Sequence, residues 1–91
     1  MYAVDWVKTV LNLVATHWLS ADPVLRKAIT AACHQIDQQL AVDPFKESES
    51  RSGNKRVAFF SPLAVTFHIE EANRRVVISD LRLYRKRPKK K

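Results

Sequence analysis

The sequence predicts an α+β domain in which an antiparallel helix hairpin packs on one face of a three- to four-stranded antiparallel β-sheet. Three observations lead to this fold class. Apolar residues recur at helical spacing as far as residue 42, the segment after residue 55 is rich in β-branched and aromatic residues, and a polar stretch separates the two. With 91 residues, the chain has the size of one small domain.

The first helix is expected over residues 5–19, with Asp5 as the candidate capping residue. Its apolar residues follow one another at intervals of four, three and four, which is typical of an amphipathic helix. We expect the buried stripe to be Val7, Leu11, Val14 and Trp18.

The second helix is expected to begin at Pro23, because Asp22 can cap it and proline suits a first helical turn. It should end near Val42, before Asp43-Pro44. The connection between the two helices is short, so they should form an antiparallel hairpin. The predicted buried stripe of the second helix is Leu25, Ile29, Ala32, Ile36 and Leu40.

Three strands are expected after a polar loop at residues 43–55. They cover residues 56–60, 63–70 and 75–84 and should form an antiparallel meander. Residues 2–4 are a candidate for a short fourth strand.

Side chains alternate between the two faces of each predicted strand. One face of the sheet is apolar and must cover the helices, so the other is left toward solvent or a partner. We expect the apolar face to carry Val65, Phe67, Ile69, Val77, Leu81 and Leu83. The second face should carry Thr66, His68, Glu70, Asp80, Arg82 and Tyr84.

Positive charge is concentrated at the end of the sequence. The chain has 16 Lys and Arg against nine Asp and Glu, a net charge of +7. Residues 1–81 hold nine basic and nine acidic side chains, so the seven basic residues of 82–91 account for the whole excess. We therefore expect this end to bind a polyanion. Residues 1–85 are predicted to form the domain and residues 86–91 a basic, disordered tail.

Composition also excludes several classes of protein. The single cysteine, Cys33, cannot form an intramolecular disulfide, which argues against a disulfide-stapled secreted scaffold. No signal-peptide pattern is visible, and no apolar run approaches the roughly 20 residues of a membrane span. We expect a cytoplasmic protein that does not contact a membrane. Cys33, His34 and His17 do not have the pattern of a tetrahedral metal site, so no metal ion is expected.

The strand region contains a recognisable series of motifs. One strand ends in Pro62-Leu63, the next has the form Val-x-Phe-x-Ile over residues 65–69, and an acidic turn leads to a last strand that ends in basic residues. The helix containing residues 36–40, followed by Asp43-Pro44, fits the same series. In these features the chain resembles the RelE/ParE superfamily of toxins from bacterial type II toxin–antitoxin systems.

This resemblance implies a toxin that inhibits translation by ribosome-dependent cleavage of mRNA, without a metal or another cofactor. Its partners would be a cognate antitoxin, the ribosome and mRNA. RelE-like toxins are implied to use basic residues, and often a Tyr or His, on the exposed sheet face. A ParE-like chain would instead inhibit DNA gyrase by binding it. A degenerate, non-toxic nucleic-acid-binding module is the third alternative.

Cleavage of RNA by its own 2′-hydroxyl requires a proton carrier and a cation that stabilises charge on the phosphate. Tyr84 and His68 are the candidate proton carriers, and histidine is the better matched to neutral pH. Arg82, two residues before Tyr84, is the candidate charge stabiliser. Where some members of the family have a terminal His-Tyr pair, this sequence reads Leu83-Tyr84. His68 could instead be a cross-strand partner of Asp80 or Glu70, and Tyr84 a rim residue.

Further basic residues near the predicted strands are candidates for holding RNA phosphates. Arg51 precedes the first predicted strand, although it could instead bridge Glu47 or Glu49. The residues at the end of the last strand belong to the basic run described above. The predicted phosphate- or RNA-binding set is Arg51, Lys55, Arg56, Arg85, Lys86 and Arg87.

Overall fold

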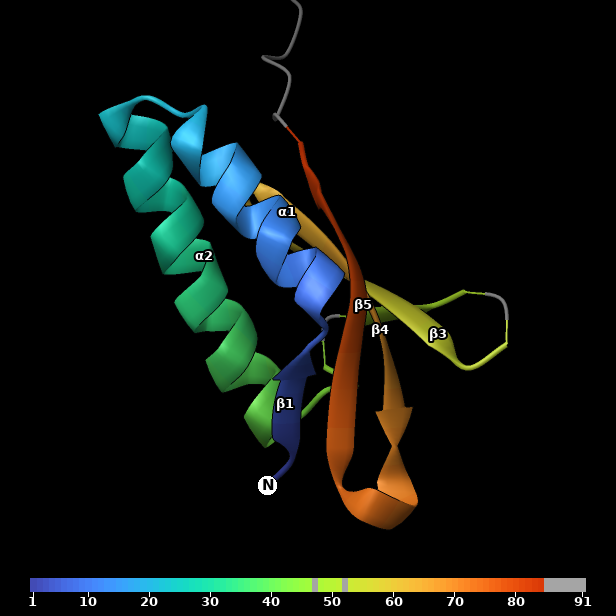
Figure 1. The fold of residues 1–91 in the computed structure, drawn as a ribbon. Coiled ribbons are helices and arrows are strands. Elements are labelled where there is room, and N and C mark those ends of the chain that lie inside the picture. Colours follow the sequence, from blue (N-terminus) through green and yellow to red (C-terminus); the bar gives the residue numbers. More distant parts are fainter. Residues whose placement is uncertain (47, 52, 85–91) are drawn as a thin grey trace, which may run out of the picture.

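The computed structural model describes residues 1–46, 48–51 and 53–84. In this part of the chain two helices lie on one side of a five-stranded sheet (Figure 1). The helices are α1 (Lys8–Leu19) and α2 (Pro23–Val42). The strands are β1 (Ala3–Trp6), β2 (Ser48–Ser50), β3 (Lys55–Phe60), β4 (Leu63–Glu70) and β5 (Arg75–Leu83), and the short helix η1 (Glu71–Asn73) joins β4 to β5.

The predicted α+β class and the antiparallel meander β3-β4-β5 are confirmed. The sheet, in the order β1-β5-β4-β3-β2, differs from the prediction at its two edges. At one edge the candidate strand at residues 2–4 forms as β1, but it pairs with β5 in parallel, from Ala3 opposite Arg75 to Trp6 opposite Ile78, so the sheet is mixed. At the other edge β2 forms within the predicted loop and pairs with β3. The sheet therefore has five strands instead of three to four.

Helix α2 has the predicted start and end, and four residues of its predicted stripe are buried, whereas Leu25 is partly buried against the core. The Asp22 carboxylate accepts a hydrogen bond from the backbone N–H of Leu25 at 2.8 Å, and Pro23 occupies the first turn. Helix α1 begins later than predicted, at Lys8, because Asp5 belongs to β1 and does not cap it.

The buried stripe predicted for α1 is wrong at two positions. Val10 is fully buried, whereas Leu11 is 52% exposed and Trp18 is 38% exposed. Leu13 and Val14 pack against the core beside Val10. The side of α1 that contacts the sheet is thus centred one residue earlier than the spacing indicated. Helical spacing identified the helix, but several apolar stripes were available on it and only packing selects one.

A β-bulge in β5 changes the alternation predicted for that strand. The pairing with β4 shifts between Thr66 and Phe67, so that Asp80 lies opposite Thr66 but Ile78 lies opposite Phe67, and Ser79 is the extra residue. Val77 consequently lies opposite His68, on the face away from the helices. The prediction that Val77 shares the apolar face with Leu81 is therefore wrong.

The hydrophobic core lies between the helices and the facing side of the sheet. Phe67 and Ile36 are fully buried in it, from β4 and α2 respectively. The other buried residues of this core are Val10, Ile29, Ala32, Leu40, Ala58, Phe60, Leu63, Val65, Val76, Ile78 and Leu81. Over the described residues, neither helix is both long enough and apolar enough to cross a membrane.

Removing the cap of α2 is expected to destabilise the protein moderately. Asp22→Ala should lower the free energy of unfolding by about 1 kcal/mol, because the N–H of Leu25 loses its acceptor. Urea denaturation followed by circular dichroism measures this change. Ser20→Ala is the control, since Ser20 lies in the same turn and the described hydrogen bonds do not include its hydroxyl. Equal stability of the two variants would show that the cap does not contribute.

Candidate functional site

The candidate site lies on the outer face of the sheet, which we define as the face turned away from α1 and α2. Side chains that lie opposite one another in paired strands share a face, so the register arranges the outer face in rows. The first row is Phe59, Ala64 and Arg82. The second is Val57, Thr66 and Asp80, and the third is Lys55, His68 and Val77.

Arg82 and Tyr84 lie together at the end of the outer face that carries the first row. The backbone N–H of Tyr84 donates to the carbonyl of Pro62 at 2.8 Å, which holds the residue beside the β3–β4 turn. The rings of Tyr84 and Phe59 pack edge to face, with centroids 5.7 Å apart and planes at 87°. Arg82 is exposed, and no carboxylate of a described residue forms an ion pair with it. Its guanidinium is therefore available to an anionic ligand.

Asp80 is the acidic residue nearest to Arg82 along β5. It lies on the same face and is exposed. Its carboxylate accepts a hydrogen bond from the backbone N–H of Leu81 at 2.8 Å and does not bond to Arg82. The negative charge of Asp80 therefore lies beside the candidate site but does not form an ion pair with the guanidinium of Arg82.

His68 belongs to a different set of contacts, near the opposite end of the outer face. Its Nε2 lies 3.3 Å from a carboxylate oxygen of Glu70. Glu70 is also 3.9 Å from the guanidinium of Arg75, which in turn pairs with Asp5 at 3.0 Å. This chain of contacts, which we call the His68 cluster, crosses β4, β5 and β1 and consists of His68, Glu70, Arg75 and Asp5.

The two candidate proton carriers are therefore on one face but not in one site. Along β4, His68 lies four residues from Ala64, the neighbour of Arg82, which corresponds to about 13 Å at the usual rise of a strand. Tyr84 is level with Pro62 and so lies still farther from His68. Arg82 and Tyr84 thus lie at one end of the outer face and His68 lies near the other.

The contacts of Glu70 lower the pKa of its carboxyl. The largest cause is the hydrogen bond with His68, followed by the one from Asn73, and the positive charge of Arg75 adds to them. Folding therefore favours the ionised carboxylate.

The depressed pKa of Glu70 predicts an acid-sensitive contribution to stability. This contribution is present above the usual range of a glutamate, near pH 4.3, and is lost as the pH falls through the lower value of the folded state. We expect His68→Ala to reduce the loss of thermal stability between about pH 5 and pH 3. Thermal melts across this range test it, with Glu70→Gln as the reference that lacks the titrating group. Parallel pH profiles for His68→Ala and the unaltered protein would contradict the expectation.

The predicted phosphate-binding residues do not gather around Arg82. Arg51 forms an exposed ion pair with Glu49 at 3.1 Å, one of the pairings considered from the sequence. Lys55 lies in the row of His68. Arg56 lies opposite Phe67 and thus on the helix side of the sheet, where it donates to the hydroxyl and carbonyl oxygens of Ser48. Arg85, Lys86, Arg87 and the tail at 86–91 lie outside the described residues.

Phe59 is a residue of this face that sequence reasoning missed. Its side chain is 55% exposed, yet it lies in the row of Arg82 and contacts Tyr84. Strand alternation could have found it, because Lys55, Val57 and Phe59 must share one face of β3 if Ala58 and Phe60 face the core. The same alternation would have assigned Arg56 to the core side.

No set of three or more His, Cys, Asp or Glu side chains suitable for a metal ion occurs among the described residues. Cys33 is half-buried in α2. Burial, and to a lesser extent the negative charge of Asp37, raises the pKa of its thiol. A raised pKa leaves less thiolate, the form that binds metals and reacts as a nucleophile.

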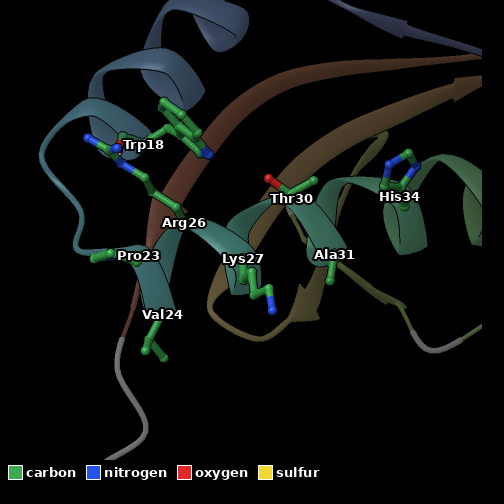
Figure 2. A pocket seen from close by; sticks show the side chains of 8 residues that line it. All are labelled: Trp18, Pro23, Val24, Arg26, Lys27, Thr30, Ala31 and His34. Atoms are coloured by element: carbon green, nitrogen blue, oxygen red, sulfur yellow. The ribbon is translucent and has the colours of Figure 1, made fainter.

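A second surface feature is a hollow along the outward side of α2, beside Trp18 of α1 (Figure 2). Arg26 lies over the indole of Trp18 at 4.3 Å and donates to the backbone carbonyls of Trp18 and Leu19, so it also holds the helix turn. The lining contains apolar and cationic side chains and no acidic one. It consists of Trp18, Pro23, Val24, Arg26, Lys27, Thr30, Ala31 and His34.

The chain is similar to solved structures that include the following two. One is a chain of the RelBE2 toxin–antitoxin complex from Mycobacterium tuberculosis, with a TM-score of 0.71 and 15% identity over 90% of each chain. The other is the isolated RelE toxin of E. coli, with a TM-score of 0.62 and 10% identity over 96% of this chain and 88% of that chain. No family model and no curated protein sequence matches the chain. The chain thus has the fold of RelE toxins, as predicted.

Proposed function

We propose that this protein is the toxin of a type II toxin–antitoxin pair and that it inhibits translation by cleaving mRNA on the ribosome. The RelE fold supports the first part of the proposal. The observation that carries the second is the arrangement of Arg82 and Tyr84 on the same end of the sheet. Arg82 is an exposed cation that forms no ion pair with a described residue, and Tyr84 carries a phenol. This pair supplies the charge stabilisation and the proton transfer that cleavage needs.

The reaction assigned to this pair is internal transesterification of RNA. The 2′-oxygen attacks the adjacent phosphorus, a 2′-O–P bond forms and the P–O5′ bond breaks, which leaves a 2′,3′-cyclic phosphate and a 5′-hydroxyl. Arg82 stabilises the negative charge on the phosphorane. Tyr84 donates its phenolic proton to the leaving 5′-oxygen and then recovers a proton from water, while the proton of the 2′-hydroxyl passes to water. This step uses no metal ion.

His68 is the alternative proton carrier, and its position separates the two assignments. If cleavage uses His68, the scissile phosphate lies over the His68 cluster, about 13 Å from the first row of the outer face. We expect His68→Ala to retain cleavage, since Tyr84 shares its end of the sheet with the exposed Arg82, whereas His68 is hydrogen-bonded to Glu70. If His68→Ala does not cleave mRNA and Tyr84→Phe still does, His68 and not Tyr84 is the proton carrier.

The proposed activity is tested by mapping RNA ends in a purified translation system. Primer extension should detect cuts within translated codons when the protein is present, and none when ribosomes are left out. Trapped gyrase–DNA breaks with intact transcripts would replace the proposal with gyrase inhibition. If the protein causes neither mRNA cleavage nor gyrase–DNA breaks, and bacteria that express it grow normally, the third alternative, a non-toxic nucleic-acid-binding module, is favoured.

An antitoxin is the protein partner that this proposal requires, and the hollow beside Trp18 suits one. Its lining combines an exposed indole and Val24 with the cations Arg26 and Lys27, so it is complementary to an acidic amphipathic segment. We place one antitoxin segment there. The basic run that includes Arg85, Lys86 and Arg87 is assigned to the phosphates of ribosomal RNA or mRNA, with an affinity that falls steeply with salt.

A further inference from the structure

We infer that Phe59 is a stacking platform for a nucleobase of single-stranded RNA, beside the phosphate that Arg82 holds. This inference rests on the proposed function and adds to it a residue that binds the RNA substrate by stacking on one of its bases. The starting observation is that Phe59 is 55% exposed. The register puts it in the first row of the outer face, and at the edge of β3 it also lines a hollow with Gln38 and Val42 of α2. Among the exposed large apolar side chains of the described residues, Phe59 is the one in this face, since the others lie on helices, near the first residue or beside β2.

The register places Phe59 at a useful distance from the cation. Phe59, Ala64 and Arg82 lie side by side on three adjacent strands. Neighbouring strands are about 4.8 Å apart, so the backbones of Phe59 and Arg82 are separated by about 10 Å. Ala64, whose side chain is a methyl group, lies between them, so the register sets a ring on one side of it and a guanidinium on the other. A nucleotide that lies across Ala64 can place its base on the ring and its phosphate at Arg82.

The contact with Tyr84 fixes the ring in place. Because the two rings pack edge to face at 5.7 Å, Phe59 is held on one flank and remains exposed elsewhere. This contact also places the bound base next to the phenol that we assign to proton transfer. An RNA strand with one base stacked on Phe59 is therefore positioned for the transesterification that we assign to Arg82 and Tyr84.

The chemistry of phenylalanine determines what such a platform recognises. Its ring has no hydrogen-bonding group, so it can stack on any base without reading base edges. Sheets that bind single-stranded RNA use aromatic side chains in this way. We therefore expect Phe59 to add affinity with little sequence preference.

The experiment uses the full chain and a short 2′-O-methyl RNA with a single 2-aminopurine, because such a strand cannot be cleaved through its 2′-oxygen. Binding should quench the 2-aminopurine fluorescence by stacking. Phe59→Leu keeps an apolar side chain but removes the ring, and it should weaken binding by about 5- to 150-fold and abolish the quench. Phe59→Trp should restore both.

Phe45→Leu is the matched control, because Phe45 is 45% exposed but lies under Arg56 at the helix side of the sheet. It should bind and quench like the unaltered protein. Circular dichroism of all variants verifies the fold.

The results also separate this inference from the proposed function. Unchanged affinity and quench in Phe59→Leu would overturn the stacking role, even with mRNA still cut on ribosomes. Binding by the unaltered protein without a quench would overturn it as well. Loss of antitoxin binding in Phe59→Leu with RNA binding unchanged would make Phe59 a protein contact instead. If the unaltered protein neither binds the RNA nor cuts mRNA, both proposals fail.

Discussion

Tyr84→Phe and Arg82→Ala should each abolish growth arrest when the protein is expressed in a bacterial host. Removing the phenol hydroxyl eliminates the proposed proton donor, which typically costs about 10²- to 10⁴-fold in rate. Removing the guanidinium eliminates charge stabilisation at the phosphate and should cost about 10²- to 10³-fold. Cleavage rates in the purified translation system measure both effects. Neither substitution removes a buried contact of the core, because Arg82 is exposed and Tyr84 keeps its ring.

The chain offers a matched control for each of these substitutions. Tyr2→Phe removes a phenol hydroxyl that bonds to Glu71, far from the first row of the outer face. Arg75→Ala removes an arginine from the same strand and face as Arg82, but one that is paired with Asp5 and Glu70. Both controls should remain toxic. Full toxicity of Tyr84→Phe and Arg82→Ala would remove these residues from the catalytic site.

The largest loss of stability is expected from Phe67→Ala. Phe67 is fully buried at the centre of β4, and truncating such a side chain typically costs about 3–5 kcal/mol through lost burial and the cavity that remains. Since domains of this size are stable by about 5–15 kcal/mol, the variant should lose a large part of its stability. Its midpoint of thermal unfolding should fall by about 15–30 °C.

Phe59→Ala is the control for this loss, because it makes the same change on the opposite face of the same sheet, where the ring is 55% exposed. Urea denaturation of both variants gives the comparison. A cost below about 1 kcal/mol for Phe67→Ala would mean that the sheet does not pack against the helices through this residue.

Local patterns predicted those elements that local chemistry specifies. Helix α2 has a capping aspartate, a proline in its first turn and a continuous apolar stripe, and its bounds follow from these signals. The strands β3, β4 and β5 are rich in residues that favour strands.

The edges of the sheet were predicted only in part: the candidate strand at residues 2–4 corresponds to β1, whereas β2 and the parallel pairing of β1 were not expected. Strand β2 reads Ser-Glu-Ser, has no strand preference of its own and forms because it pairs with β3. Strand β1 has four residues and finds its partner about seventy positions away in β5. Such pairings depend on tertiary contacts, which a local pattern does not contain.

The sequence predicted which residues of the candidate site share a face only where the side chains of β5 alternate regularly, that is, after the bulge. Arg82 and Tyr84 are two residues apart after the bulge, so their common face followed directly. The extra residue Ser79 reversed the alternation before it and moved Val77 to the outer face. The alternation alone could not show that His68 lies far from Tyr84, because that distance depends on the register between strands.

The position of β5 in the sheet has a consequence for biosynthesis. This strand lies between β1 and β4, although it is the last of the five in the chain. Until it leaves the ribosome, β1 has no neighbour to pair with, and the segment carrying Arg82 and Tyr84 does not yet exist outside the exit tunnel. The sheet can therefore be completed only after β5 has been made, when this strand pairs with β1 on one side and with β4 on the other.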